Sequence, residues 1–375
     1  MRQLASIQKI TSLESIDGAD RIELATILGW KVIVKKGEFA VGDKCIYIEI
    51  DSLLPEIPQF EFLRSKDFKV KTMKMRGVVS QGICFPLSIL PAGQYEINMD
   101  VTEILGVTKY DIEDDADLLQ STSSVKKSRV FTFLMRYSFF RSIFFYFFPR
   151  KKSYGDFPSQ FVAKTDETRI QSTPSTLDKY AGLDFVVTEK LDGKSATYLL
   201  AITKRKFLPP HYNFIACSRN KRAGEGSEIL SMARKYHIKE ALIDIAKSRK
   251  AQKFVCIQGE VIGSKIQENK YKIDGYDFFA FNFIIDGQMS SYNHMVNTFM
   301  PLEIRCVPSL GLIPLPNSVN ELVELSKGKS KLYDCNREGI VVRCADDSRK
   351  SFKVINPDFL LEKEEKLNKK RKGTV

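Results

Sequence analysis

The stretch VVTEKLDGKSATY, from Val186 to Tyr198, holds a lysine, a carboxylate and a glycine inside a run that otherwise favours a β-strand. Lys190 and Asp192 stand two positions apart, and Gly193 follows at once. One interpretation is a hairpin turn, because Asp-Gly between β-branched residues is a common turn signal. The other is a functional site at the end of a strand, and the rest of the chain must decide between the two.

Length and composition set the first bounds. The 375 residues exceed one typical domain, so we expect two domains and at least one sizeable core. Lysine and arginine number 58 against 46 acidic residues, and the net charge of +12 suits a polyanionic partner such as nucleic acid or an acidic membrane surface. The seven scattered cysteines indicate neither a zinc site nor a disulfide framework. Because the N-terminus also lacks the apolar core of a signal peptide, we expect an intracellular protein, with cytoplasm and nucleus not distinguished.

An aromatic-rich segment spans residues 129–152 and raises the question of a membrane. Arg136 and Arg141 interrupt it before about 20 apolar residues accumulate, so we expect no stable membrane insertion. The favoured interpretation is a helix packed between two domains, and the alternative is an interfacial amphipathic anchor with basic flanks.

Residues 1–110 show the period of short β-strands, with apolar and polar residues alternating between Gly and Asp turn signals. This pattern predicts a small OB-like β-barrel that binds nucleic acid. Lys69, Lys71, Lys74 and Arg76 recur at strand-like spacing. They indicate either a solvated face or a surface that follows a nucleic-acid backbone.

Residues 111–154 are acidic, then rich in Ser and Lys, then aromatic, which predicts a linker with a helical segment. Residues 155–375 mix strand-like runs with one strong helix pattern over residues 227–250, whose apolar positions share one face. We therefore predict an α+β chain, in which an extended antiparallel sheet follows the barrel.

Four of these predicted strands carry a charge at or near an end, at Lys190, Glu260, Glu338 and Lys353. Each alone is most simply a solvent-facing or snorkelling side chain. Because an unpaired buried ion costs several kcal/mol, roughly, the four together favour a single site. Two lysines with two or three carboxylates suit a divalent cation and a nucleoside triphosphate.

The order of the motifs EKLDG, SRN, QGEVIG, FFAFNF, EGIV and SFKVIN resembles that of the covalent lysyl-nucleotidyltransferases, which include DNA ligases, RNA ligases and mRNA capping enzymes. Only a short tail follows SFKVIN, and the OB-like part comes first. This arrangement resembles the ATP-dependent nick-sealing RNA ligases of the fifth RNA ligase family, with an N-terminal OB domain and a C-terminal nucleotidyltransferase (adenylation) domain.

The resemblance implies a role for each charged residue. Lys190 would attack the α-phosphorus of ATP and hold AMP, which requires an unprotonated amine. Asp192, Glu260 and Glu338 would organise Mg²⁺ or Mn²⁺, directly or through water. Lys353 would neutralise the α-phosphate as charge develops.

The resemblance also implies contacts to the nucleotide. Phe279, Phe281 and Phe283 alternate along one predicted strand, and Phe281, with Phe279 next, is expected to stack on adenine. The simpler alternative is a set of core phenylalanines. The other residues assigned to cofactor binding are Glu189, Gln171, Arg219 and Lys350, of which Lys350 replaces a second motif lysine where this chain has Ile355.

The implied function is ATP-dependent sealing of RNA 3'-hydroxyl and 5'-phosphate ends in three steps through a lysyl-AMP intermediate. The expected partner is a nicked duplex or an RNA:DNA hybrid, and the expected state is a monomer. Two alternatives stay open, a DNA ligase of the same superfamily and a non-catalytic RNA-binding protein.

Overall fold

The structure is a computed structural model and describes residues 3–109 and 155–372. The predicted linker, with its aromatic-rich segment, lies outside these described residues. Within the described ranges, no helix is both long and apolar enough to cross a membrane.

Contacts within the chain define two compact units. The described residues of the first are 3–8, 44–71 and 82–109, and those of the second are 9–43, 72–81 and 155–372. The N-terminal segment thus contributes to both units, and the predicted domain boundaries stay a prediction.

Many short strands form the N-terminal region, as its alternating pattern predicts. One sheet has the order β3-β2-β1-β4-β9 and comprises β1 (Ala5–Ser15), β2 (Ile22–Ile27), β3 (Trp30–Lys35), β4 (Lys44–Ile48) and β9 (Ile83–Phe85). The smaller sheets are β10-β5-β6, made of β5 (Ser52–Leu53), β6 (Lys69–Val70) and β10 (Thr108–Lys109), and the hairpin of β7 (Thr72–Met75) and β8 (Val78–Gln81). Short 3₁₀ helices lie at η1 (Pro58–Lys66) and η2 (Leu87–Ile89).

The four basic residues at strand-like spacing do not line one strand. Lys69 lies in β6 and Lys74 in β7, which belong to different sheets, because the strand is interrupted at Lys71. Arg76 lies in the turn between β7 and β8 with a φ of 50°. The expectation of a single basic strand face is therefore wrong.

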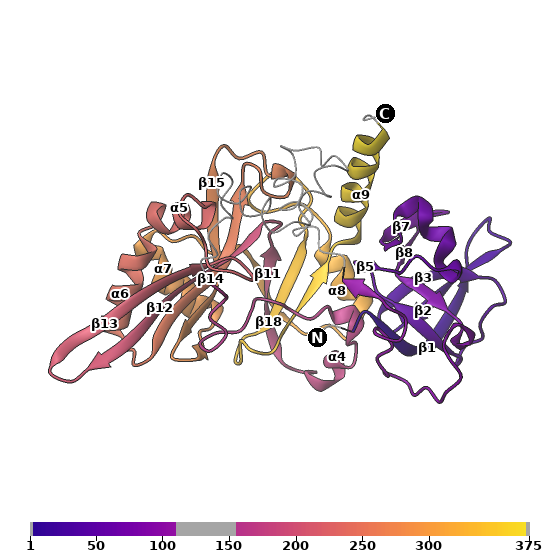
Figure 1. Cartoon of the computed structure of the whole chain (residues 1–375), viewed down its shortest axis with the longest axis horizontal. Helices are drawn as coiled ribbons and strands as arrows, with labels where there is room; N and C mark the ends of the chain where they lie inside the picture. Colours follow the sequence, from indigo (N-terminus) through magenta and orange to yellow (C-terminus); the bar gives the residue numbers. More distant parts are fainter. Residues whose placement is uncertain (1–2, 110–154, 373–375) are drawn as a thin grey trace, which may run out of the picture. The chain divides into compact units, whose positions relative to one another are not determined.

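Two antiparallel sheets dominate the second unit and confirm the predicted fold class (Figure 1). The first has the order β17-β11-β18-β19, made of β11 (Asp184–Lys190), β17 (Ser309–Pro314), β18 (Gly339–Cys344) and β19 (Ser351–Ile355). The second has the order β13-β12-β14-β15-β16, made of β12 (Lys194–Arg205), β13 (Leu208–Cys217), β14 (Phe254–Gly263), β15 (Tyr276–Ile285) and β16 (Gln288–Met289).

The helices of this unit are short apart from the C-terminal one. They are α4 (Thr176–Lys179), α5 (Glu228–Lys235), α6 (Ile238–Ser248), α7 (Tyr292–Phe299), α8 (Val319–Ser326), α9 (Pro357–Lys372) and the 3₁₀ helices η3 (Ile170–Ser172), η4 (Gln267–Asn269) and η5 (Met300–Leu302). The predicted single helix over residues 227–250 is two helices. The break falls at His237, whose φ of 48° is incompatible with a continuous α-helix.

The largest core lies between the five-stranded sheet and α5, α6 and α7, which cover one of its faces (Figure 1). Ile229, Met232 and Ala233 of α5 are buried there, as the apolar period predicts. The opposite face of this sheet carries Glu260 and Phe279, which pair across β14 and β15. The helices therefore leave the second face of the sheet available for a site.

The Asp-Gly pair does not form a hairpin. β11 ends at Lys190 in the four-stranded sheet, and β12 begins at Lys194 in the five-stranded sheet, so the residues between them cross from one sheet to the other. A Cβ on Gly193 would lie 2.4 Å from the carbonyl oxygen of Val261 and 2.8 Å from Cγ of Glu260. The crossing thus requires glycine because it passes directly against β14.

We predict that Gly193→Ala destabilises the protein by about 3 kcal/mol or more, since the contact is with backbone that has no room to move. Urea unfolding measures the loss. The control is Gly182→Ala, where φ is +78° and no atom lies within 4 Å of the added Cβ, so that only the left-handed backbone is penalised, by about 1 kcal/mol. Equal losses in the two variants would contradict the close approach.

Candidate active site

The register of the four-stranded sheet sets the centre of the site. Lys190, the last residue of β11, pairs with Gly339, the first residue of β18. Glu338 directly precedes that strand, and Nζ of Lys190 donates a hydrogen bond to its Oε2 at 2.6 Å. The backbone N–H of Asn356, at the end of β19, donates to the carbonyl oxygen of Glu338 and holds this corner. Two residues 148 positions apart in sequence thus form a partly buried ion pair.

The charges around Lys190 favour its ammonium form. Burial is the largest single influence and lowers the pKa of Lys190, but the negative charge of Glu338, that of Glu260, the hydrogen bond to Glu338 and the charge of Asp192 together raise it above its ordinary value. The surroundings of Lys190 in the ligand-free protein therefore favour the protonated amine.

Asp192 lies in a buried environment that includes both tyrosine and lysine. Its backbone N–H donates to Oη of Tyr271 at 2.7 Å, and its Oδ1 lies 3.8 Å from Nζ of Lys363 on α9. Its Oδ2 is buried and has no hydrogen-bond partner among the described residues. Burial, followed by the charge of Glu338, raises the pKa of Asp192 to about 6, against the lowering effects of Lys363, Lys190 and Lys270.

Glu260 completes the acidic group from the other sheet. It is the one residue of β14 that is not fully buried, and it pairs with Ser195 of β12. No three acidic, histidine or cysteine side chains of the described ranges are arranged as a direct metal-ligand set. The buried unpartnered oxygen of Asp192 and the carboxylates beside Lys190 suit a hydrated divalent cation, which binds carboxylates partly through its waters.

Lys353 lies on the same face of its sheet as Lys190. Lys190 pairs with Gly339 and Lys353 pairs with Val341, two residues further along β18, so both side chains project to one side. Nζ of Lys353 lies 3.9 Å from Oδ1 of Asp166, and Nη2 of Arg219 donates to Oδ2 of the same carboxylate at 2.5 Å. Asp166 thus brings two of the predicted site residues together.

Glu189 does not share that face. As the neighbour of Lys190 in β11 it points to the opposite side, toward the core that includes Phe185, Val187 and Ile340. One oxygen of its buried carboxylate accepts a hydrogen bond from the backbone N–H of Lys331 at 2.8 Å. The structure therefore gives Glu189 a position behind the site.

Lys350 also lies apart. Its carbonyl oxygen accepts from the backbone N–H of Cys344, at the end of β18 away from Gly339, and its Nζ lies 5.8 Å from the ring of Tyr180. At about 3.3 Å per residue, the length of β18 separates Lys350 from Glu338.

Gln171 is buried in the second unit, where its carbonyl oxygen accepts a hydrogen bond from the backbone N–H of Gly29.

Strict alternation along β15 predicts that its three phenylalanines share one face, but in the structure they do not. A register shift between Gln258 and Gly259 leaves Phe281 as an extra residue in β15. Beyond this bulge Phe283 points into the helix-covered core, whereas Phe279 lies in the cluster around Leu191 with Phe281 beside it. Phe279 is buried, so Phe281, which is partly exposed, has surface to offer a base.

Sequence reasoning missed four residues of this site, namely Asp166, Lys270, Tyr271 and Lys363. Lys270 has a buried Nζ directly over the ring of Phe359, and burial lowers its pKa. Each comes from a loop or from α9, where polar and charged residues are ordinary and carry no signal. Asp166 stands in the stretch TDETRIQ, of which sequence reasoning assigned only Gln171 to the site.

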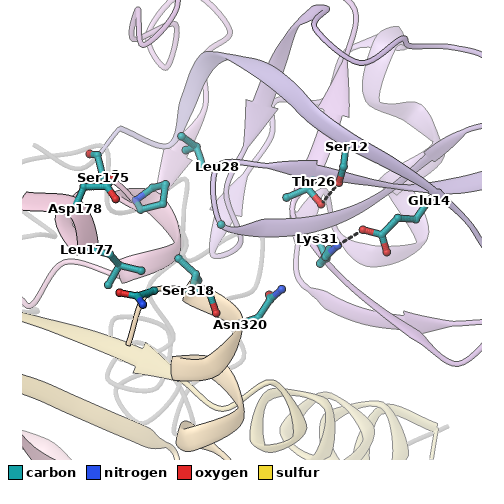
Figure 2. A pocket seen from close by; sticks show the side chains of 14 residues that line it. Ser12, Glu14, Thr26, Leu28, Lys31, Ser175, Leu177, Asp178, Ser318 and Asn320 are labelled. Atoms are coloured by element: carbon teal, nitrogen blue, oxygen red, sulfur yellow. Dashed lines mark hydrogen bonds and ion pairs between the residues drawn. The ribbon is translucent and has the colours of Figure 1, made fainter. Parts of the chain in front are cut away.

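A separate pocket of about 590 Å³ in the second unit contains none of the predicted site residues. Figure 2 shows its polar lining, with Ser175 and Asp178 on one side and Glu14 ion-paired to Lys31 at 2.5 Å on the other. It therefore lies apart from the chemistry assigned to Lys190.

Comparison with protein families matches both parts of the chain. A model of an OB-fold domain matches residues 4–87, and a model of RNA ligase matches residues 183–355. The second range includes Lys190, Asp192, Glu260, Glu338 and Lys353. A comparison with curated protein sequences gave no match.

Solved structures of an RNA ligase from Naegleria gruberi are similar over nearly the whole chain. A lysine-to-alanine mutant without ligand has 26% sequence identity and a TM-score of 0.76, and the match covers 96% of this chain and 98% of that one. Another lysine-to-alanine mutant, with ATP and Mn, has 27% identity and a TM-score of 0.76 and covers 95% and 98%. The structure with PPi has 27% identity and a TM-score of 0.75 and covers 96% and 98%.

The fold and the lysine-centred site are those of a covalent nucleotidyltransferase with an N-terminal OB-fold, as the sequence predicts. Within that class residues 183–355 match the RNA ligase model, and the protein is an ATP-dependent RNA ligase.

We predict that Asp192→Asn stabilises the ligand-free protein. The pKa of Asp192 is raised from 3.8 to about 6, so its buried charge costs stability above about pH 6, and this cost vanishes as the pH falls below 4. Urea unfolding should show a gain of about 3 kcal/mol at pH 8 that disappears near pH 4. A control, Asp244→Asn on the exposed face of α6, should stay within about 0.5 kcal/mol at each pH. A gain that does not change with pH would contradict the assignment.

Proposed function

We propose that this RNA ligase seals 3'-hydroxyl and 5'-phosphate ends held at a nick in duplex RNA or an RNA:DNA hybrid, with Lys190 as the residue that carries AMP. The observation that supports this proposal most directly is the position of Lys190 at the end of a strand. There it donates a hydrogen bond to Glu338 and interacts electrostatically with Glu260 and Asp192. The activity has three steps: AMP moves from ATP to the lysine, then to the RNA 5'-phosphate, and then leaves as the 3'-hydroxyl attacks.

The Naegleria gruberi relative supports ATP and a divalent metal as the cofactors. Its structures include complexes with ATP and Mn, with AMP and Mn, and with PPi, which correspond to the substrate, the transferred group and the leaving group of the first step. They also include alanine mutants of a lysine and of the aspartate two positions after it, the spacing of Lys190 and Asp192 here.

In the first step, neutral Nζ of Lys190 attacks the α-phosphorus. The N–P bond forms as the bond to the bridging oxygen breaks, and pyrophosphate leaves with that electron pair. Oε2 of Glu338, at 2.6 Å, is placed to take the proton that Nζ gives up. A bound Mg²⁺ or Mn²⁺, held by Asp192, Glu260 and Glu338 directly or through water, supplies the positive charge that offsets these carboxylates and the triphosphate.

Lys353 and Arg219 are suited to hold phosphate. Both converge on the exposed carboxylate of Asp166, and both carry charge that a phosphate oxygen can attract in its place. Lys353 projects beside Lys190 and so meets the α-phosphate, whereas Arg219 meets the ribose or the incoming 5'-phosphate. Asp166 keeps the two cations in position until the nucleotide arrives.

Phe281 is the proposed platform for adenine. Its partly exposed ring lies at the bulge of β15, and its carbonyl oxygen accepts a hydrogen bond from Nη1 of Arg343 at 2.8 Å. Because Arg343 belongs to β18 and also donates a hydrogen bond to Glu167, this contact connects the proposed adenine platform to the strand that begins beside Lys190.

The monomeric state of the protein remains a prediction.

We predict that the protein incubated with α-labelled ATP and a divalent cation retains label after denaturing electrophoresis, and that Lys190→Ala retains none. The reason is that only a covalent N–P bond survives denaturation. The control is Lys194→Ala, because Lys194 follows four residues later and pairs with Glu228 instead. Labelling of Lys190→Ala at the wild-type level would overturn the assignment.

We also predict that the 3'-terminal ribose at the nick is required. A site built to read a hydroxyl discriminates strongly against its absence, so replacing that one nucleotide by its 2'-deoxy form should slow sealing by about tenfold or more. Single-turnover sealing by preadenylylated enzyme measures the effect. Equal rates on both nicks would favour a DNA ligase instead.

A further inference from the structure

The hairpin of β12 and β13 extends well beyond the rest of its sheet (Figure 1). β12 starts at Lys194, two residues after Asp192, and runs for 12 residues, which corresponds to about 40 Å. The nine residues from Thr203 to His211, around the tip, are all exposed. One strand thus leads directly from the catalytic crossing to a distant projecting tip.

The tip carries an aromatic residue where both solvation and backbone disfavour it. Phe207 is 93% exposed, and its φ of 66° lies in the left-handed region that bulky side chains rarely adopt. Leu208 beside it is 61% exposed. Neither residue is required by a core, so packing within this unit does not explain them.

Positive charge surrounds these apolar residues. Lys204, Arg205 and Lys206 precede Phe207, and the run from Thr203 to His211 contains no acidic residue. Nζ of Lys206 lies 5.4 Å from the centre of the Phe207 ring. A register shift between Thr203 and Arg205 bends the hairpin just before the tip. The tip therefore combines three cations with an exposed ring, the pairing that binds phosphate and stacks on bases.

Self-association by strand pairing does not suit this hairpin. β13 is the edge strand of its sheet, and Pro209 and Pro210 lie in its exposed part. Proline has no N–H to donate, so a second strand cannot pair there. A polyanion fits the charge, and the RNA ligase activity already brings one to the same unit.

We propose that the β12–β13 tip is a second RNA contact, which binds the duplex remote from the nick through phosphate contacts by Lys204, Arg205 and Lys206 and through Phe207 against a base or sugar. This inference rests on the proposed function of the site at Lys190. A duplex lying along the roughly 40 Å of β12 meets the tip more than about ten base pairs from the nick. The tip thus selects long duplexes over short ones.

The experiment uses the full chain and compares nicked RNA duplexes with arms of about 20 and about 6 base pairs, lengthened on each side separately. The variants are Lys204→Ala/Arg205→Ala/Lys206→Ala and, alone, Phe207→Asn, which suits the left-handed backbone and should fold at least as well as the wild type. The control is Lys247→Ala/Arg249→Ala/Lys250→Ala, which removes the same charge at the exposed end of α6. Duplex affinity is measured across a salt series, and sealing is measured as KM and kcat.

The expected result is a loss of about tenfold or more in affinity for the long duplex in the triple variant, with the salt slope reduced by about 2 to 3 and kcat unchanged. Phe207→Asn should raise KM on the long duplex only. The short duplex should bind all variants as it binds the wild type.

Three results would overturn the proposal: no loss on the long duplex, the same loss on both lengths, or the same loss in the α6 control. A fourth is binding of anionic phospholipid vesicles that Phe207→Asn abolishes while RNA binding stays intact, which would assign the tip to a membrane surface. Labelling of Lys190 by ATP needs no RNA and should be unchanged throughout. Its absence in the wild type would therefore count against the proposed function and not against the tip.

Discussion

The ion pair between the Lys190 ammonium and the Glu338 carboxylate depends on a single register, in which the last residue of β11 pairs with the first residue of β18. A shift of one residue would move Lys190 to the core-facing side, where Glu189 now lies. The same register places Lys353 on the face of Lys190. The apolar face of this sheet therefore does more than stabilise it, because its burial determines which charged residues meet on the other face.

A second constraint comes from the crossing between the two sheets. Gly193 lets the chain pass against β14, so that Glu260 of one sheet and Glu338 of the other both act on Lys190. Arg343 ties the sheets together again through the carbonyl of Phe281 and through Glu167. The proposed nucleotide site thus lies where the ends of strands from two sheets meet, which restrains the positions of Lys190 and Glu260.

In the protein without ligand, the negative charges of the site are not fully balanced by positive ones. Burial and Glu338 raise the pKa of Asp192, while the carboxylates outweigh the effect of burial and raise that of Lys190. Both shifts indicate a deficit of positive charge, although Lys363 and Lys270 already lie nearby. Such a site lowers the stability of the ligand-free protein, and binding of a cation restores part of that stability. Active sites commonly show this trade-off between stability and activity.

By itself the sequence determined the class of fold, most of the strands and the place of Lys190 in the order of motifs. Period-2 patterns and charges within apolar strands are local signals that need no tertiary structure to be seen. It did not determine which of Phe279, Phe281 and Phe283 share a face, because the bulge in β15 depends on its pairing with β14. Nor did it find Asp166, Tyr271 or Lys363, whose positions beside Lys353 and Asp192 exist only after distant segments pack together. Tertiary structure decided these contacts, since a charge in a loop or terminal helix acquires a role only from what folding places within a few ångströms of it.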